Sequence, residues 1–320
     1  MKEIHLWNFI RHHLSQNHPV ILLAVVHHDK GSPGKEGFKM AVTKSGESVG
    51  SIGGGVMEYN ILKNCTKLFK ENFPVNTIET LFHNRKSTST RSGLICAGSQ
   101  TNFTLRLNKK DISVVDKILN SLRHNQQGKI IFSSKGISFS NAGSNKTQFV
   151  FDFKDESNWR YEQSTGTENI LYVIGGGHVG LAVSKIMSLL DFYVIVYDSR
   201  DNLQTMNENI YADKKIISPY EKLGKIIKEN SFVVIVTTGF ESDKEALEQV
   251  ITKKTKYIGL MGTKVKIKKI FNEAVKDGVK KELLKKVRAP IGIDINSDTP
   301  EEIAVSIAAE IIKIKNSNSS

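Results

Sequence analysis

Three glycines in the second half of the chain have the spacing of a phosphate-binding turn. Gly175, Gly177 and Gly180 form the pattern G-x-G-x-x-G directly after the apolar, β-branched run Ile170–Ile174. In such a turn the first glycine allows a sharp bend, the second lets the backbone approach a pyrophosphate, and the third lets the helix pack against the strand. The N–H groups of a helix beginning near His178 would face the phosphates. The pattern predicts a site for a nucleotide-like diphosphate.

An acidic residue follows the next expected strand. Phe192–Tyr197 is apolar, and Asp198 lies at its end, at about the spacing of a ribose-binding carboxylate. Such a carboxylate favours NAD over NADP because it repels a 2′-phosphate, whereas Arg200 would weaken that preference. His178 either hydrogen-bonds a phosphate, contacts a redox ring, or is only a tolerated polar residue whose protonation the helix dipole disfavours. A nicotinamide-dependent oxidoreductase is compatible with this segment, although no convincing set of catalytic acid and base residues accompanies it.

Two further segments that could carry chemistry lie in the first half. Gly53, Gly54 and Gly55 separate a strand-like run from a helical one, and consecutive glycines favour close approach by a ligand or another backbone. Glu58 would lie in the first turn of that helix, where it faces a ligand or simply complements the dipole. Cys96 lies in a loop of small residues, and its thiol is a candidate nucleophile, sulfur carrier or soft metal ligand. A buried structural thiol is the alternative.

The composition indicates a soluble globular protein. The chain has 320 residues, of which 39% are hydrophobic and 24% charged, and this length accommodates two domains. No apolar run approaches the ~20 residues of a membrane span, and the N-terminus lacks the features of a signal peptide. The two cysteines, Cys65 and Cys96, have no CxxC partner, which argues against structural zinc and fits a reducing compartment. We therefore predict a cytoplasmic protein without a membrane partner.

The net charge of +12 raises the question of nucleic-acid binding. The lysines are scattered along amphipathic segments such as Lys253–Lys256 and Lys264–Lys269, and no recognisable nucleic-acid module accompanies them. Aromatic residues make up only 8% and form no interleaved stacking platform. We interpret the charge as a solvated lysine-rich surface, which would also help to dock an acidic partner protein.

The expected elements divide the chain into two domains. From residue 169 to 315, strands alternate with helices through short loops, which predicts a Rossmann-like, doubly wound parallel sheet within an α/β protein. From residue 1 to 155 the pattern is mixed and predicts an α+β domain. The polar segment 156–168 is expected to be a linker, and 316–320 a frayed tail. Helices are expected over Ile4–His18, Val56–Lys70, Ile112–His124, Glu221–Glu229, Lys244–Thr252, Lys264–Val275 and Pro300–Ile314, the last opening with the capping sequence Asp298–Glu302.

Together these motifs resemble the XdhC/CoxI family, the accessory proteins of molybdenum hydroxylases such as xanthine dehydrogenase. The resemblance covers nearly the whole chain in the order of the family. It departs at Cys96-Ala97-Gly98, where many relatives have two glycines after the cysteine, and at Asn296-Ser297, which replace smaller residues. The matching blocks are Gly31–Gly34, Lys39–Val42, Gly50–Glu58, Ile95–Gly98, Ile174–Gly180, Val196–Arg200, Tyr257–Gly262 and, most specific to the family, Ala289–Asp294 and Thr299–Ile307.

The resemblance implies a chaperone that binds the molybdenum cofactor or its dinucleotide form, protects it during sulfuration and delivers it to an apo-hydroxylase. NAD(P) remains the alternative ligand, and a non-catalytic nucleotide sensor the third possibility. A cysteine desulfurase is a further candidate partner, and we expect a homodimer. On this basis Cys96 and Glu58 are the candidate catalytic residues, with Cys96 a potential contact to molybdenum or its sulfur. The predicted cofactor-binding residues are Gly53, Gly54, Gly55, Gly175, Gly176, Gly177, His178, Val179, Gly180, Asp198, Arg200 and Gly262.

Overall fold

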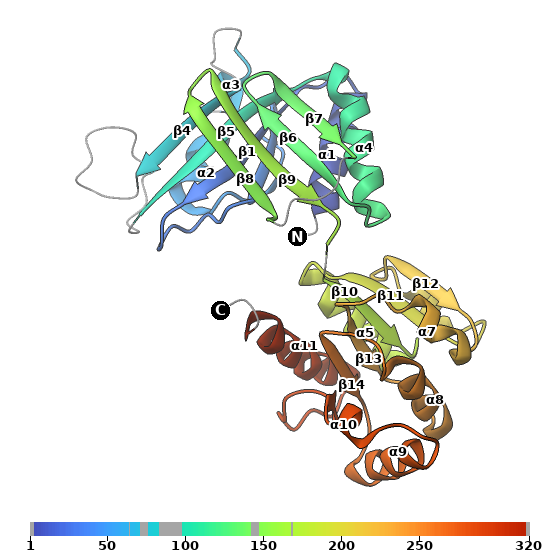
Figure 1. Cartoon of the computed structure of the whole chain (residues 1–320). Coiled ribbons are helices and arrows are strands. Elements are labelled where there is room, and N and C mark those ends of the chain that lie inside the picture. Colours follow the sequence, from blue (N-terminus) through green and yellow to red (C-terminus); the bar gives the residue numbers. More distant parts are fainter. Residues whose placement is uncertain are drawn as a thin grey trace. The chain divides into compact units, whose positions relative to one another are not determined.

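The chain forms two compact units in the computed structural model (Figure 1). The structure describes residues 3–63, 65–70, 76–82, 98–141, 147–167 and 169–317. Unit 1 is Met1–Gly166 and unit 2 is Thr167–Ser320.

Unit 1 contains two antiparallel sheets. The five-stranded sheet has the order β3-β2-β1-β5-β4, and the four-stranded sheet has the order β7-β6-β9-β8. The strands are β1 (Val20–His28), β2 (Lys39–Thr43), β3 (Ser48–Gly50), β4 (Thr77–Phe82), β5 (Ser99–Leu107), β6 (Gly128–Ser133), β7 (Gly136–Ser140), β8 (Phe149–Asp155) and β9 (Asn158–Thr165). The helices are α1 (Glu3–Ser15), α2 (Gly55–Lys63), α3 (Cys65–Leu68) and α4 (Ile112–Arg123), with a 3₁₀ turn at Lys109–Asp111.

Strand β1 is the centre of unit 1 because it is buried on both faces. One face packs into a core that also receives α1, α4 and the inner residues of the four-stranded sheet. In this core the ring of Phe103 stacks on Trp159 and packs at a tilt against Phe132. The opposite face of β1 packs against Met57 of α2. The apolar character of Val20–His27 is thus explained by a strand that contacts two hydrophobic layers.

The prediction of a linker over residues 156–168 was wrong, because most of this segment forms strand β9. Trp159, Tyr161, Gln163 and Thr165 alternate inward along this strand, while their neighbours are exposed or half-buried. A strand with one solvated face reads as polar in sequence, so the period of two was hidden. The two units divide immediately after β9, between residues 166 and 167.

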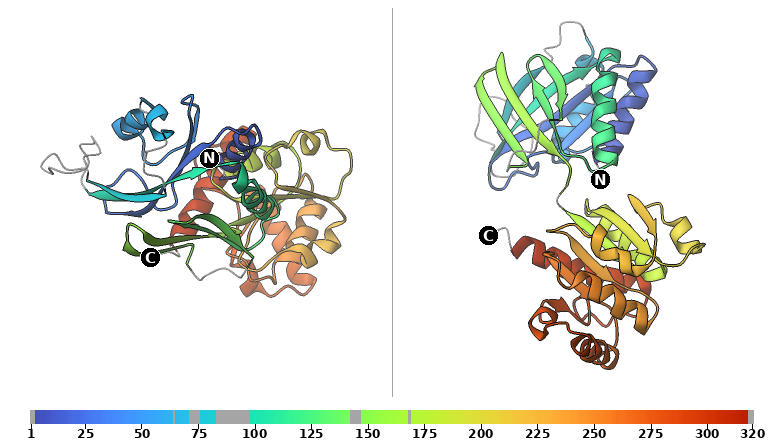
Figure 2. Two further views of the ribbon diagram at one scale, coloured as in Figure 1. Left: turned by 90° about the horizontal axis from the view of Figure 1, so that it is seen from above. Right: turned by 45° about the vertical axis from the view of Figure 1, so that its right-hand side comes forward.

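Unit 2 is a six-stranded parallel sheet with helices on both faces (Figure 2). The strand order is β12-β11-β10-β13-β14-β15, which is 3-2-1-4-5-6 in order of sequence. The strands are β10 (Ile170–Ile174), β11 (Tyr193–Asp198), β12 (Lys214–Ile217), β13 (Phe232–Ile235), β14 (Tyr257–Leu260) and β15 (Val287–Arg288). The helices are α5 (His178–Leu189), α6 (Gln204–Glu208), α7 (Leu223–Ile226), α8 (Phe240–Val250), α9 (Lys264–Lys276), α10 (Lys281–Leu284) and α11 (Pro300–Ser317), with a 3₁₀ turn at Tyr220–Lys222.

Alternate residues of these strands supply two separate cores. Leu171 and Val173 of β10 face α5 and α11, whereas Tyr172 and Ile174 face α7, α8 and α9. The strand order reverses between β10 and β13, so the carboxyl ends of these two strands form a topological switch point. The expected doubly wound parallel sheet is therefore confirmed, together with an N-terminal α+β unit.

Several expected helices have different limits in the structure. The helix expected over Val56–Lys70 ends at Lys63, and the short α3 follows it. The helix expected over Glu221–Glu229 is reduced to a 3₁₀ turn and the four-residue α7. The final helix continues to Ser317, into the segment expected to be a tail, and begins with reciprocal hydrogen bonds between Thr299 and Glu302.

Candidate functional site

The glycine turn after β10 requires glycine at two of its three glycine positions. Gly175 has a φ of +116°, and a Cβ there would lie 2.5 Å from the carbonyl oxygen of Val236 on the neighbouring segment. A Cβ at Gly180 would lie 2.0 Å from the carbonyl oxygen of Gly175, so the third glycine allows α5 to pack against the turn. At Gly177, in contrast, a Cβ would meet no atom within 4 Å. The first and third glycines prevent clashes with neighbouring backbone carbonyl groups, and the second leaves open space beside the turn.

That open space lies at the N-terminus of α5. Gly177 is the N-cap, no side chain caps the helix there, and its first turn carries no acidic residue. The helical hydrogen bonds begin with Leu181 N–H donating to Gly177 O at 2.9 Å, so the N–H groups of the preceding turn lie outside the ladder. His178 is exposed and Val179 is half-buried at this end. Free N–H groups and the positive pole of the dipole make this end suited to an anion.

Asp198, expected to contact a ligand hydroxyl, has its carboxylate fully engaged within unit 2. Its Oδ2 accepts from Gly176 N–H at 2.7 Å and from Nη2 of Arg200 at 2.8 Å, while Oδ1 accepts from the backbone N–H and Nε of Arg200, both at 2.9 Å. Burial by itself would raise the pKa of Asp198, but these hydrogen bonds outweigh it and hold the pKa below its usual value. The carboxylate is 0% exposed and positions both the glycine turn and Arg200.

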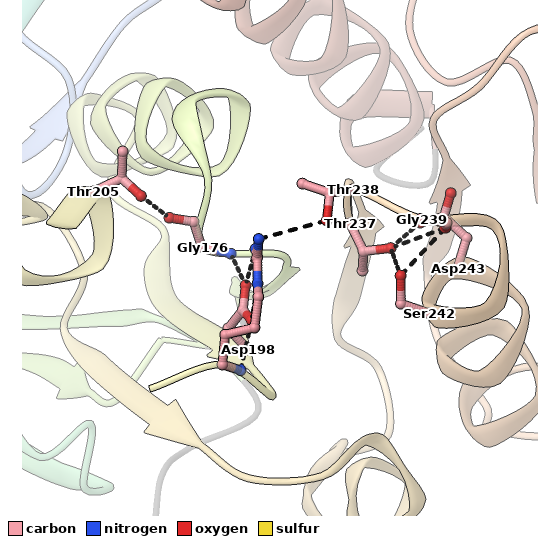
Figure 3. A network of polar contacts seen from close by, with 9 residues as sticks. Gly176, Asp198, Thr205, Thr237, Thr238, Gly239, Ser242 and Asp243 are labelled. Atoms are coloured by element: carbon pink, nitrogen blue, oxygen red, sulfur yellow. Dashed lines mark hydrogen bonds and ion pairs between the residues drawn. The ribbon is translucent and has the colours of Figure 1, made fainter. Parts of the chain in front are cut away.

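Two threonines that the sequence did not assign to the site complete it (Figure 3). The hydroxyl of Thr205, at the start of α6, donates to Gly176 O at 2.6 Å, so both backbone polar groups of Gly176 are fixed. Thr238 follows β13 and its Oγ1 accepts from Nη1 of Arg200 at 3.5 Å. The position of Thr238 at the end of a strand next to β10 is the signal by which it could have been found.

A second polar network begins beside Thr238. Thr237 contacts Ser242 at 2.7 Å and donates to Oδ1 of Asp243, which is fully buried in the first turn of α8 (Figure 3). Nζ of Lys266, from the first turn of α9, lies 2.5 Å from Oδ2 of Asp243. Burial raises the pKa of Asp243, and Lys266 and Thr237 oppose that effect. The network ties the N-termini of α8 and α9 together at the carboxyl edge of the sheet.

Gly262 lies beside this network rather than within the glycine turn. It follows β14, and a Cβ there would lie 3.2 Å from Cδ of Lys266. Thr263 is the N-cap of α9 and accepts from Lys266 N–H at 3.2 Å. The predicted binding residues of unit 2 thus lie at the end of β11 or directly after β10, β11 and β14, all at one edge of the parallel sheet.

The triple glycine and Glu58 form a separate turn in unit 1. All three glycines have a positive φ, and a Cβ at Gly53 would lie 2.7 Å from Gly34 N. Oε1 of Glu58 accepts from Ile52 N–H at 2.8 Å, from Gly54 N–H at 2.7 Å and from Ser51 Oγ at 2.8 Å. Glu58 therefore reaches back from α2 and holds the turn that precedes its own helix.

Cys96 lies outside the described residues. Within the described ranges, no group of three or more His, Cys, Asp or Glu side chains is arranged to hold a metal ion. The helices of those ranges also include none that is long and apolar enough to cross a membrane.

Two models of known protein families match this chain, one in unit 2 and the other in unit 1. Residues 171–311 match the XdhC Rossmann domain, and residues 13–79 match the XdhC and CoxI family. The chain belongs to the XdhC and CoxI family. The XdhC Rossmann domain thus includes the glycine turn, Asp198, Arg200 and the network around Asp243.

Two curated proteins and one solved structure are similar to this member of the XdhC and CoxI family. The uncharacterized protein YqeB of Escherichia coli is 24% identical over 308 residues, which is 94% of this chain and 44% of YqeB. A probable xanthine dehydrogenase subunit of Bacillus subtilis is 26% identical over 147 residues, 45% of this chain and 42% of that protein. The chain spans less than half the length of both relatives. A crystal structure described as a xanthine dehydrogenase from Bacillus halodurans has the same fold, with a TM-score of 0.72, 22% identity and coverage of 99% of this chain and 96% of the other.

Proposed function

We propose that this protein is an accessory factor that binds the molybdenum cofactor and assists its sulfuration and insertion into a xanthine dehydrogenase-type hydroxylase. The observation that carries the proposal is membership of the XdhC and CoxI family through matches in both units. The Bacillus subtilis relative is described as a probable xanthine dehydrogenase subunit, which supports the same client class.

The chemistry of the glycine turn fits the phosphate of this cofactor. A phosphate is an acceptor-only anion, and the N-terminus of α5 offers N–H donors beside the space that Gly177 leaves open. Gly175 and Gly180 hold the turn, and His178 and Val179 contribute the first N–H groups of the helix. When bound, the cofactor would supply the molybdenum and its exchangeable sulfur, while the protein's part is to bind the phosphate and shield the group from water.

We propose different roles for Glu58 and Cys96. Because Oε1 of Glu58 accepts three hydrogen bonds from its own turn, we assign it the role of shaping unit 1. Cys96 is proposed, from the family resemblance, to approach the metal or its sulfur. A basic surface, with a net charge of +12, would favour an acidic face on the client enzyme or on a cysteine desulfurase.

The test is activation of a client. An apo-hydroxylase is incubated with a source of the cofactor, with and without this protein, and the active fraction of the hydroxylase is measured. A higher active fraction with the wild-type protein, and less gain with a Cys96→Ser variant, are expected. An active fraction that does not respond to the protein contradicts a role in maturation.

An NAD(P)-dependent oxidoreductase is the second candidate, favoured by the 3-2-1-4-5-6 strand order and the glycine turn, which are those of dinucleotide-binding folds. If the protein is such an oxidoreductase, it should retain NAD(P) rather than a pterin when it is purified. The non-catalytic nucleotide sensor predicts the same ligand without any turnover.

A further inference from the structure

The guanidinium of Arg200 spans the switch point of the sheet. Arg200 follows β11 and Thr238 follows β13, and these strands are the two neighbours of β10. The contact from Nη1 to Thr238 therefore carries the side chain across the end of β10, where the glycine turn begins. Asp198 bonds both Gly176 N–H and Arg200, so the guanidinium and the turn are joined through one carboxylate.

The groups presented at this position are donors. The hydrogen bonds of Arg200 use Nε, one N–H of Nη1 and one of Nη2, and a guanidinium has five N–H groups. Its side chain is 41% exposed, whereas Asp198, the acceptor expected for a ribose diol, is 0% exposed and bonded at both oxygens. The hydroxyls of a sugar diol need an acceptor to donate to. Asp198 cannot serve as that acceptor in this structure, because its carboxylate is buried and already accepts hydrogen bonds at both oxygens. A phosphate oxygen is matched by the guanidinium.

We propose that Arg200 is a specificity-determining residue that selects a phosphomonoester, and rejects an unphosphorylated ribose diol, beside the glycine turn. Asp198 acts as the positioning residue that holds the guanidinium in place. This inference reverses the preference for NAD over NADP that Asp198 suggests in the sequence. It rests on the proposal that the glycine turn binds a phosphate-bearing ligand, and it deepens that proposal by naming the group that lies next to Arg200.

The experiment uses NAD and NADP as probes, because they differ only by the 2′-phosphomonoester. Calorimetric titration of the full-length protein is expected to show NADP binding roughly tenfold to a hundredfold more tightly than NAD. Arg200→Gln is expected to remove this difference, and Arg200→Lys to retain part of it, because lysine keeps the charge but loses the paired donors. Arg288→Gln, at an exposed arginine on the edge strand β15, is the matched control and should leave the difference unchanged.

A second variant separates the two roles of the acidic residue. Asp198→Asn keeps an acceptor for Gly176 but loses the ion pair that holds the guanidinium of Arg200, so the preference for NADP should fall while the affinity for NAD stays unchanged. If the carboxylate bound a ribose diol, this variant would instead weaken NAD binding. Circular dichroism of each variant confirms that unit 2 is folded before titration.

Equal binding of the two probes, tighter binding of NAD, binding of neither, or a preference that survives Arg200→Gln would overturn the inference. None of these results touches the proposed function, which is tested by activation of a client hydroxylase without added NAD or NADP. Conversely, if the protein prefers NADP but fails to activate the client, the inference about Arg200 stands and the proposed role in cofactor maturation is rejected.

Discussion

Replacing Gly177 by aspartate should weaken the binding of a phosphate-bearing cofactor about a hundredfold without unfolding the protein. A Cβ at this position meets no atom within 4 Å, and the backbone has a φ of −73°, which any residue adopts. Gly177 is also the N-cap of α5, where Asp and Asn are favoured over Gly by a few tenths of a kcal/mol. The substitution therefore fits the fold and places a carboxylate in the proposed anion site.

The expected loss follows from Coulomb's law. Two unit charges about 5 Å apart repel by roughly 3 kcal/mol at an effective dielectric constant of about 20, which corresponds to an approximately hundredfold weaker affinity. Gly177→Asn has nearly the same size and no charge, so it should weaken binding by only a few-fold. The comparison between these two variants isolates charge from volume.

The assay is a fluorescence titration with the oxidised, fluorescent pterin phosphate of the cofactor, before and after phosphatase treatment. Wild-type protein and Gly177→Asn should bind the phosphorylated form more tightly than the dephosphorylated one, and Gly177→Asp should not. Thermal unfolding should show all three proteins to be folded. If Gly177→Asp binds as tightly as Gly177→Asn, the phosphate does not lie at the N-terminus of α5 and the reasoning is refuted.

Three further predictions concern stability. Gly180→Ala should lower the free energy of unfolding by about 1–3 kcal/mol, because its Cβ would lie 2.0 Å from Gly175 O, and unchanged denaturant melts would contradict that packing. Glu58→Ala should cost about 1–3 kcal/mol by leaving the N–H groups of its turn without their acceptor, whereas Glu58→Gln should cost less. Equal melting temperatures for these two variants would exclude the turn-holding role. Since the pKa of Asp198 is lowered in the folded state, its stabilising contribution is present above the unfolded value of about 3.9 and lost as pH falls through the folded value. Acid unfolding of Asp198→Asn should accordingly depend less on pH than that of the wild type; matching profiles would argue against the assigned hydrogen bonds.

The features that follow from local backbone constraints could be predicted from sequence. Gly175 and Gly180 are required because a Cβ at either position would lie 2.5 Å or less from a backbone carbonyl oxygen, and a glycine pattern of fixed spacing records that requirement directly. The alternation of apolar strands with helices likewise predicted the parallel sheet, since strands buried on both faces are continuously apolar. Strand β9 was missed because its exposed residues made the segment read as a polar linker.

The partners of the site's side chains could not be predicted in the same way. Asp198 has the spacing of a ribose-binding carboxylate, but the path of the Arg200 side chain back onto it depends on packing at the switch point. The pairing of Asp243 with Lys266 joins two helices that are separated by a strand in the sequence. Such contacts depend on the tertiary fold, and no local spacing records them.

The central claim is that the glycine turn of unit 2 holds the phosphate of the molybdenum cofactor. Its most direct test is to purify the wild-type protein and Gly177→Asp from cells that make the cofactor, and to identify the released small molecule by pterin fluorescence and mass. The account predicts a phosphorylated pterin with molybdenum in the wild-type preparation and its loss from Gly177→Asp. Release of NAD(P) without pterin, or equal pterin in both preparations, would contradict it.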